Sequence, residues 1–480
     1  MSASREKRER KITKKPAPLK KSHKLRNGLI IGVVALLLVY MAASSLKMFH
    51  RTFAAVSVGD VSFTAAEANM HFNLVLQQYG FSREDVEMYK SYFLQQAQTT
   101  MQNEAMLSRE AQKNGMTLSA ENKQMIDDTI AYIREQAKLA NVSFQNLMAL
   151  NYGEGVTESV FRKVSERSML AYQWQEKKGE EFTASTAESE TYYAEHPDDI
   201  NKAVYYSYAV TWTTAEDATE DEIAAAKEEA RVKAQTVNNS ITSLDSFYEE
   251  IALLAPDTAP SSLVRTSYLS NLASQTDLYN FLKDDARKSG DHALIEADSS
   301  YSVVVFESLG REEYVAPSYY SMTIMPSDAS DAASLQEARA KADAILQEWQ
   351  AGAKTEESFV TLAAQRVEEG VVTNNGLIEN VTKTFTGSAD QAWLFDSART
   401  AGDAVVVDLG GAYGVFYFVR WSDKPYWEVM AGSMIINEKY NEYTTQLAAE
   451  YPYKTRALGQ LFVTDKEEPV EPSPTETVEG

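Results

Sequence analysis

The chain has 480 residues, of which 44% are hydrophobic and 24% charged, and its net charge is −23 at pH 7. That length accommodates roughly three domains, and the negative charge excludes binding of DNA or RNA by the folded part because phosphate groups would be repelled. The lack of cysteine excludes disulfides, thiol catalysis and Cys-ligated zinc, and five histidines without metal-ligand spacing predict neither a metal site nor a cofactor.

The first 46 residues contain a basic segment followed by an apolar one. Residues 1–27 hold eleven Lys or Arg and two Glu, whereas residues 28–46 hold no charged side chain. As a helix, the apolar segment would be about 28 Å long, close to the hydrocarbon thickness of a bilayer. It is therefore predicted to be a transmembrane helix in the cell membrane, in contact with lipid, with residues 1–27 as a cytoplasmic tail and the chain after Lys47 extracytoplasmic. Two alternatives are a cleaved signal peptide, whose apolar core is normally shorter, and a nucleic-acid-binding tail at residues 5–26.

Residues 56–200 are predicted to form an all-α domain after one short strand. The strand is VSVGDVSF at 56–63, whose side chains alternate between apolar and polar. Thr64 and Glu67 then have the spacing of a capping box that begins a helix. Amphipathic periodicity and helix-stop signals such as Asn114-Gly115 predict four long helices. These helices cover about 64–79, 84–113, 119–140 and 157–178.

Methionine is concentrated in this helical block, which holds eight of the fifteen in the chain. The side chain is flexible and polarizable, so a surface rich in methionine can contact many different apolar partners. The simpler interpretation is that these methionines fill a helical core. The sequence leaves both interpretations open.

The second half of the chain contains one small domain twice. LKDDARKSGD at 282–291 returns as LFDSARTAGD at 394–403, 112 positions later, and YSVVVF at 301–306 returns as YGVFYF at 413–418. Each copy begins with a strand, continues with helices and ends with two strands. The two domains are therefore predicted at 203–316 and 317–426, each with helices packed on an antiparallel sheet. The recurring Gly-Asp is predicted to form a turn, and the recurring arginine an ion pair.

The rest of the chain completes the predicted fold class. Residues 427–464 are predicted to be mainly helical, and residues 465–480 are acidic and rich in proline, which predicts disorder. The whole is therefore predicted to be a multidomain α+β protein with an N-terminal transmembrane helix, an all-α domain, two α+β domains and a C-terminal helix.

Several segments together resemble the parvulin-type folding factors of the bacterial cell envelope, the SurA and PrsA families. VSVGDVSFTAAE at 56–67 is similar to the start of the SurA N-terminal chaperone domain, and ESETYYAEHPDDI at 188–200 to the helix that precedes a parvulin domain. Residues 318–420 resemble the parvulin domain itself through SFVTLAAQ, NNGLI and YGVFYFVR. The resemblance implies a chaperone domain followed by two peptidyl-prolyl isomerase-like domains.

The sequence departs from the parvulin pattern at the positions that the resemblance marks as catalytic. Two histidines are expected there, but the second repeat has Met322 and Phe416, and the first has Tyr208 and Val304. The resemblance also places Trp393 and Phe395 at apolar pocket positions, so Met322, Trp393, Phe395 and Phe416 are the candidate substrate-binding residues. The only acidic residues near the end of the second helix are Glu368 and Glu369. No catalytic residue is assigned.

Prolyl isomerisation must cross a barrier near 20 kcal/mol that amide resonance sets. A catalyst lowers this barrier by holding the twisted amide and directing polar groups at it. Methionine and phenylalanine in place of histidine would keep an apolar groove but remove those groups, which predicts peptide binding with weak or absent turnover. The alternative is that the repeats are spacers whose grooves are filled by their own side chains.

These observations lead to three hypotheses for function. The first is a membrane-anchored extracytoplasmic chaperone that binds unfolded exported polypeptides. The second is an active parvulin-type peptidyl-prolyl cis-trans isomerase. The third is a membrane-anchored adaptor that binds one folded partner of the cell envelope.

Overall fold

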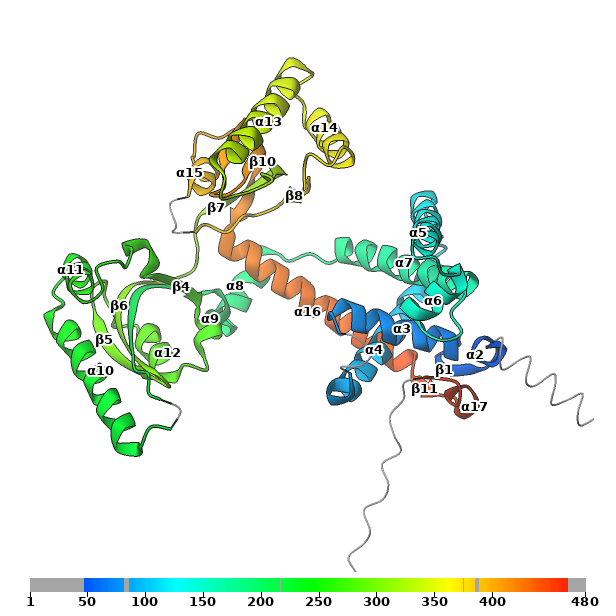
Figure 1. Ribbon diagram of the computed structural model, residues 1–480, viewed down its shortest axis with the longest axis horizontal. Helices are drawn as coiled ribbons and strands as arrows, with labels where there is room; N and C mark the ends of the chain where they lie inside the picture. The colour runs from blue at the N-terminus through cyan, green and yellow to red at the C-terminus, as the bar shows by residue number, and fades with distance from the viewer. Residues whose placement is uncertain (1–46, 82–85, 216, 374, 385–387, 465–480) are drawn as a thin grey trace, which may run out of the picture. The chain divides into compact units, whose positions relative to one another are not determined.

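The computed structural model describes residues 47–464 except 82–85, 216, 374 and 385–387. The described chain forms two compact units (Figure 1). One contains residues up to Phe182 together with those from Tyr440 onward, and the other contains Thr183–Lys439. Helix α16 (Tyr426–Glu450) contributes residues to both units.

The N-terminal unit combines helices with a three-stranded antiparallel sheet. The sheet has the order β11-β1-β2, from β1 (Ala54–Val58), β2 (Val61–Thr64) and β11 (Tyr453–Thr455). Gly59, with φ of +55°, makes the tight turn between β1 and β2, a conformation that glycine adopts without a steric penalty. The helices are α2 (Met48–Thr52), α3 (Ala65–Gln78), α4 (Lys90–Lys113), α5 (Ala120–Leu139), α6 (Phe144–Tyr152), α7 (Glu158–Glu181) and α17 (Ala457–Gln460), with the 3-10 turn η1 (Glu87–Tyr89).

Local sequence explains where the long helices begin. Thr64 and Glu67 form the predicted capping box, in which the Thr64 side chain accepts from the Glu67 backbone N–H and Glu67 accepts from that of Thr64. Ser119, Ser143 and Thr157 cap α5, α6 and α7 through their hydroxyl groups, each of which accepts a hydrogen bond from the backbone N–H three residues later. The core of the unit lies between the sheet, α4, α7 and the end of α16. Its members include Phe63, Met101, Met106, Trp174, Leu447 and Tyr451.

The fold class predicted from the sequence is wrong for the N-terminal domain. The N-terminal domain is not all-α, because β1 and β2 pair with a third strand that residues 453–455 supply from the far end of the chain. Furthermore, no helix within the described residues has the length and apolar character needed to cross a membrane. The predicted transmembrane segment 28–46, the basic tail 1–27 and the acidic tail 465–480 all lie outside the described residues.

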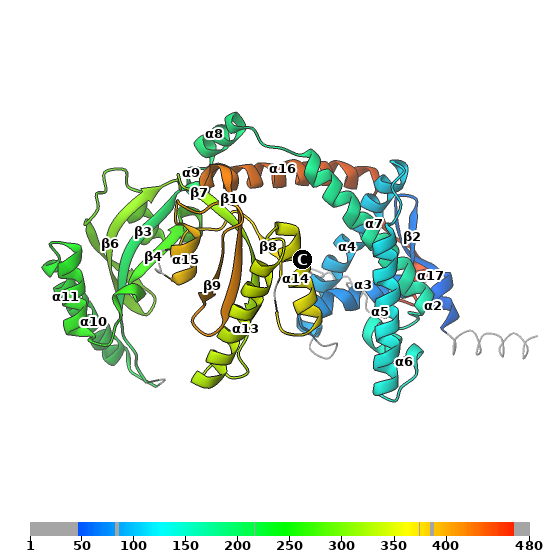
Figure 2. The ribbon, with the colours of Figure 1, turned by 90° about the horizontal axis from the view of Figure 1, so that it is seen from above.

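The second unit contains the two repeats, and both have the same sheet topology (Figure 2). The first sheet has the order β4-β3-β6-β5 and the second β8-β7-β10-β9, so equivalent strands occupy equivalent places. The two repeats thus share one arrangement of strands. The first repeat contains β3 (Lys202–Thr211), α10 (Glu220–Ser240), α11 (Leu244–Leu254), η2 (Pro260–Ser262), β4 (Val264–Tyr268), η3 (Leu269–Leu272), α12 (Thr276–Lys283), β5 (His292–Ala297) and β6 (Ser300–Gly310). The second contains β7 (Val315–Ile324), α13 (Ala332–Ala351), α14 (Glu356–Glu368), β8 (Leu377–Ile378), α15 (Ala389–Leu394), β9 (Ala404–Asp408) and β10 (Tyr413–Pro425).

Two short helices precede the first repeat, α8 (Thr186–Glu195) and α9 (Pro197–Ile200). Both belong to the compact unit of the repeats, although the sequence-based boundary placed them with the preceding domain. Trp427 and Ala431 of α16 pack against Ile200, with Tyr192 and Tyr193 beside them. The start of α16 therefore shares a small core with the segment that leads into the repeats.

The repeated Gly-Asp phrase is a turn, as predicted. The Asp291 carboxylate accepts a hydrogen bond from the Lys288 N–H at 2.9 Å, and Asp403 accepts one from the Thr400 N–H at the same distance. Gly402 has φ of +94°, which favours glycine at this position. The recurring arginines make the predicted ion pairs, from Arg287 to Asp284 at 3.2 Å and from Arg399 to Asp396 at 3.0 Å.

Candidate functional site

Met322 and Phe416, the two positions predicted to line one groove, lie on opposite faces of the second sheet. Phe416 pairs with Ser321, and Met322 pairs with Val415, so the two residues are one position out of phase. Met322 is fully buried in the core beneath α13 and α14. Phe416 is buried on the other face, beside α15. The structure therefore does not bring these two residues together.

The partner of Phe416 is Tyr319, which the sequence analysis did not single out. Their ring centroids are 4.6 Å apart. Trp393 lies 6.2 Å from Phe416, and Phe395 packs against the same cluster. Burial raises the pKa of Tyr319 to about 12, so its phenol stays neutral. This face of the second repeat is thus filled by its own aromatic side chains. That arrangement favours the alternative that the repeats are spacers whose grooves are filled by their own side chains.

Glu368 and Glu369, the only acidic candidates, are not part of that cluster. Both are exposed at the end of α14, a helix that covers the Met322 face. Glu369 pairs with Arg366 on its own helix. Neither carboxylate is placed to act on a peptide beside Phe416.

In the first repeat the two corresponding positions, Tyr208 and Val304, also lie on opposite faces of the sheet, but one of these faces has a pocket. Tyr208 packs on the α10 and α11 side, whereas Val304 packs with Tyr205 on the α12 side. On the Val304 side lies a pocket of about 530 Å³ that contains no histidine. Its lining includes Tyr205, Ser207, Arg265, Gln275, Thr276, Asp277, Glu296, Ser302 and Val304. The pocket could hold a polar peptide segment, but it lacks the imidazoles that the resemblance implies for turnover.

A larger groove, which the sequence did not predict, lies in the N-terminal unit. It has a volume of about 760 Å³ and is bounded by α3, α4, β11 and the segment around α17. None of the described residues in its lining carries a charge, although 24% of the chain is charged. The lining consists of Val56, Ala68, Phe72, Ser91, Tyr92, Leu94, Gln95, Ala97, Gln98, Met101, Tyr453, Thr455, Gln460 and Val463.

Exposed aromatic side chains and one methionine continue the apolar surface beyond the groove. Tyr92 belongs to the lining and is 45% exposed, and Tyr79 and Tyr89 are exposed to a similar degree. Met88 is 82% exposed. The buried ring of Phe93 contacts all three tyrosines and holds this aromatic rim in place. Large apolar side chains gathered on a surface in this way are typical of binding sites.

The methionines of the N-terminal unit divide between the two interpretations. Met70, Met101, Met106 and Met148 are buried in the core, which supports core filling. Met88 and Met125 are exposed and are therefore available to a partner. Met101 is buried in the core and also contributes to the lining of the groove.

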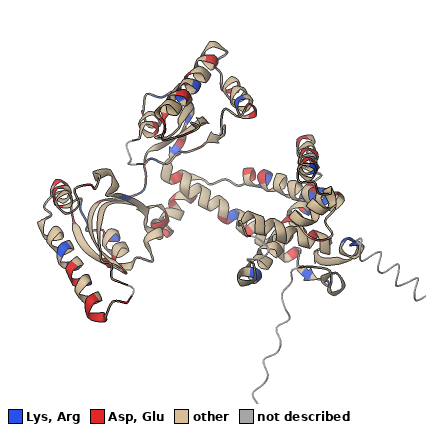
Figure 3. Cartoon of the chain, viewed as in Figure 1, with Lys and Arg blue, Asp and Glu red and all other residues tan. Residues whose placement is uncertain are grey.

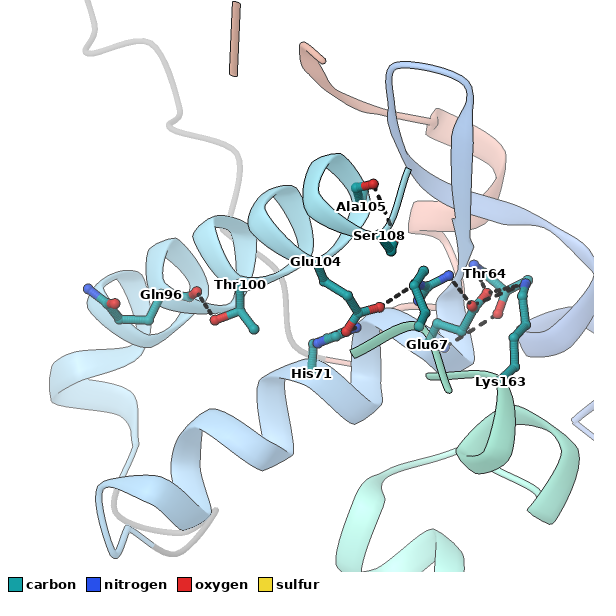
Figure 4. A network of polar contacts seen from close by, with 10 residues as sticks. Thr64, Glu67, His71, Gln96, Thr100, Glu104, Ala105, Ser108 and Lys163 are labelled. Atoms are coloured by element: carbon teal, nitrogen blue, oxygen red, sulfur yellow. Dashed lines mark hydrogen bonds and ion pairs between the residues drawn. The ribbon is translucent and has the colours of Figure 1, made fainter. Parts of the chain in front are cut away.

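A buried network of charges joins α3, α4 and α7 (Figure 4). Glu67 and Glu104 are almost fully buried. Arg167 of α7 pairs with both, at 3.1 Å from Glu67 and through its Nε atom to Glu104. His71 Nε2 lies 3.4 Å from Glu104 Oε2, and Lys163 lies 3.2 Å from Glu67. Because α3 and α4 also form walls of the groove, this network fixes the helices that shape it.

Burial alone would raise the pKa of Glu67, but Arg167, the Thr64 N–H and Lys163 together hold that pKa below its ordinary value of 4.5. Burial would likewise raise the pKa of Glu104, and here the neighbouring His71 and Arg167 outweigh it and lower the pKa. Both folded-state pKa values therefore lie below those of the unfolded chain. The corresponding stabilisation is complete above the unfolded value and is lost as the pH falls through the folded values.

The N-terminal unit is accordingly expected to lose stability as the pH falls below about 4.5. Hydrogen exchange of peptides from α4, measured from pH 7 to pH 3.5 and corrected for intrinsic exchange rates, would show this loss. The Glu104→Gln variant should be less stable at pH 7 and should lose less stability on acidification. An identical pH dependence in the wild type and the variant would contradict the role assigned to Glu104.

Charge is distributed unevenly between the two units. Residues 183–439 hold 18 Lys or Arg and 42 Asp or Glu, a net charge of −24, so the remainder of the chain is close to neutral. Acidic side chains occupy the first turn of α10, at Glu220, Asp221 and Glu222 (Figure 3). The uncharged groove therefore belongs to a nearly neutral unit that is covalently joined to a strongly acidic one.

Among the described residues, no group of three or more His, Asp or Glu side chains is arranged to hold a metal ion. No model of a known protein family matches the chain, and no curated protein is found to be similar to it. The groove and the two repeats are therefore the features from which a function is inferred.

Proposed function

We propose that the chain is a chaperone that binds unfolded polypeptide in the uncharged groove of its N-terminal unit. The observation that carries this proposal is the groove of about 760 Å³, which has exposed aromatic side chains at its rim and no charged side chain among the described residues of its lining. An unfolded polypeptide exposes apolar side chains that a folded protein buries, and such a groove would shield them from water.

The polar part of the lining fits the polypeptide backbone. Gln95 and Gln98 are exposed on α4, and each side-chain amide has both donors and an acceptor. A peptide backbone offers the complementary groups at every residue except proline, whatever its sequence. Apolar surface together with neutral amides therefore favours binding of many different segments rather than one sequence.

The repeats support this function without adding catalysis. The face that carries Phe416 is filled by aromatic side chains, and the pocket beside Val304 contains no histidine. Isomerase activity is therefore not proposed. The net charge of −24 on residues 183–439 would keep a complex with an apolar client in solution. The resemblance to the SurA and PrsA families favours exported polypeptides as clients.

The groove can be tested by placing charge in it. In the Gln95→Glu/Gln98→Glu variant, two carboxylates would have to lose water whenever an apolar segment binds, so binding of a permanently unfolded client should weaken at least about tenfold. The Thr99→Glu/Thr100→Glu variant is the matched control, since it adds the same charge to exposed positions of α4 outside the lining. The measurements are suppression of client aggregation and client affinity, both with the full chain.

Two results would contradict the proposal. If the wild-type chain at stoichiometric amounts does not suppress aggregation of an unfolded client, it is not a chaperone of this kind. If the groove variant and the control variant lose activity equally, the groove is not the binding site. Capture of one folded partner instead of many unfolded ones would favour the adaptor hypothesis.

A further inference from the structure

One edge of the sheet in the N-terminal unit is formed by β11. Within the part of the chain that the structure describes, the order β11-β1-β2 gives β11 a partner strand on one side only. Its register with β1 pairs Val56 with Thr455, Ser57 with Lys454 and Val58 with Tyr453. An edge strand presents a row of backbone N–H and C=O groups that another strand can bind.

The hydrogen bonds around β11 show which of its backbone groups face outward. Arg456 N–H donates to the Ala55 carbonyl at 2.8 Å, and Gly59 N–H donates to the Pro452 carbonyl at 3.3 Å. In an antiparallel ladder, bonded and non-bonded pairs alternate. Thr455 is therefore in a non-bonded pair, and its N–H and C=O point away from β1. Thr455 is exposed, and no hydrogen bond to its backbone is found among the described residues.

The same part of β11 borders the uncharged groove. Tyr453 and Thr455 are two residues apart, so their side chains share one face, and both belong to the lining. Ser91, Gln95 and Gln98 of α4 also belong to the lining. An extended segment placed beside β11 would therefore contact Thr455 through its backbone and the groove through alternate side chains.

We propose that the polypeptide binds as an added strand on the open edge of β11. This inference rests on the proposed function and specifies how the groove holds its client. The client backbone exchanges hydrogen bonds with the N–H and C=O of Thr455, and every second side chain of the client enters the groove. Because the main chain of the client supplies these hydrogen bonds, this binding mode suits clients that differ in sequence.

The chemistry of the groove favours an uncharged client over the chain's own C-terminal segment. Residues 465–480 begin two positions after Val463, which belongs to the lining, and they hold six Asp or Glu against one Lys. The described lining offers no basic side chain to neutralise them. Three prolines in the same segment further reduce its capacity to form a strand ladder.

Backbone methylation of a probe peptide tests the proposal without altering the protein. A short labelled peptide of alternating leucine and serine is methylated at one backbone nitrogen at a time, and each version is titrated with the full chain. Methylation should weaken binding about tenfold at the residue whose N–H faces β11 and should have little effect at the residues beside it, because only alternate N–H groups face the neighbouring strand. Equal effects at every position, or none at any position, would overturn the proposal.

A protein variant gives an independent test. Thr455→Pro removes the outward N–H without removing a hydrogen bond of the ladder, and sheets tolerate proline at such an edge position. The variant should bind the unmodified peptide about tenfold more weakly than the wild type does. Thr455→Ala, which keeps the N–H but shortens a side chain of the lining, should bind the peptide several-fold more tightly than Thr455→Pro does. Unchanged hydrogen exchange in β1 and α4 of Thr455→Pro would show that the fold is retained. Equal binding by both variants would overturn the proposal.

Hydrogen exchange at Thr455 in the wild-type chain separates the remaining outcomes. Slower exchange of this amide when the peptide is added supports strand addition. If the peptide binds without slowing it, the binding mode is wrong and the proposed function remains. If the peptide does not bind at all, the proposed function itself fails. Slow exchange before peptide is added, relieved by removing residues 465–480, would show that the chain's own segment occupies the edge and would overturn the proposal.

Discussion

Replacing Arg167 by leucine is expected to lower the free energy of unfolding of the N-terminal unit by about 3–5 kcal/mol, because buried charges that lose a partner are strongly destabilising. Glu67 and Glu104 are almost inaccessible to solvent, and Arg167 contacts both. Its guanidinium also lies 4.0 Å from the centre of the Phe63 ring, a contact that leucine would not reproduce. Hydrogen exchange of α3 and α4 at pH 7 would measure the loss.

Arg162→Leu is the matched control for this variant, on the same helix. Arg162 pairs with Asp127 at 2.7 Å and with Glu158 at 3.9 Å, and all three side chains are at least one-third exposed. An exposed ion pair contributes about 0–1 kcal/mol, so this variant should be nearly as stable as the wild type. A similar loss in both variants would mean that the buried network has no special role.

A second substitution can separate the loss of the ion pair between Arg167 and Glu104 from the other effects of removing Arg167. If the loss arises because Glu104 is left without a partner, Arg167→Leu/Glu104→Leu should be more stable than Arg167→Leu alone, since replacing both members of a buried pair by apolar residues is often close to neutral. Variants in which α3 and α4 are destabilised should also bind the client more weakly, because these helices form walls of the groove. Stability and binding are therefore expected to fall together.

Local signals in the sequence identified much of the fold. The capping box at Thr64 and Glu67 begins α3 as predicted, and the repeated phrases identify two domains that have the same sheet order. The third strand of the N-terminal sheet could not be predicted in this way. Its three residues pair with β1 from about 400 positions away, and nothing in so short a segment indicates that partner.

The candidate site shows a second limit of sequence patterns. Side chains alternate between the two faces of a strand, so an error of one position in an alignment moves a residue to the wrong face. Met322 was assigned to the groove in this way, whereas Tyr319, three positions earlier, contacts Phe416. The groove of the N-terminal unit had one visible signal, the absence of charge from Ser91 to Asn103. Its other wall comes from β11 and α17, which only the folded chain brings beside α4.

The largest effect expected in the second repeat is that of Phe416→Ala. The ring of Phe416 is buried between Tyr319, Leu394 and Val407, and a Cβ atom at Gly414 would lie only 2.5 Å from it. Removing so large a buried side chain is expected to cost about 3–5 kcal/mol, because the surroundings collapse only partly around the cavity. Hydrogen exchange of β7 and β10 would measure the loss.

Leu409→Ala is the control for this substitution, since Leu409 lies after β9 in the same part of the repeat and is 39% exposed. It should change the stability by less than about 1 kcal/mol. The Phe416→Ala variant should still bind unfolded clients, because the proposed site is in the other unit. In a protease-coupled proline peptide assay, neither variant should accelerate isomerisation above the uncatalysed rate. Faster isomerisation by Phe416→Ala would instead mean that this aromatic ring blocks a catalytic cleft in the second repeat.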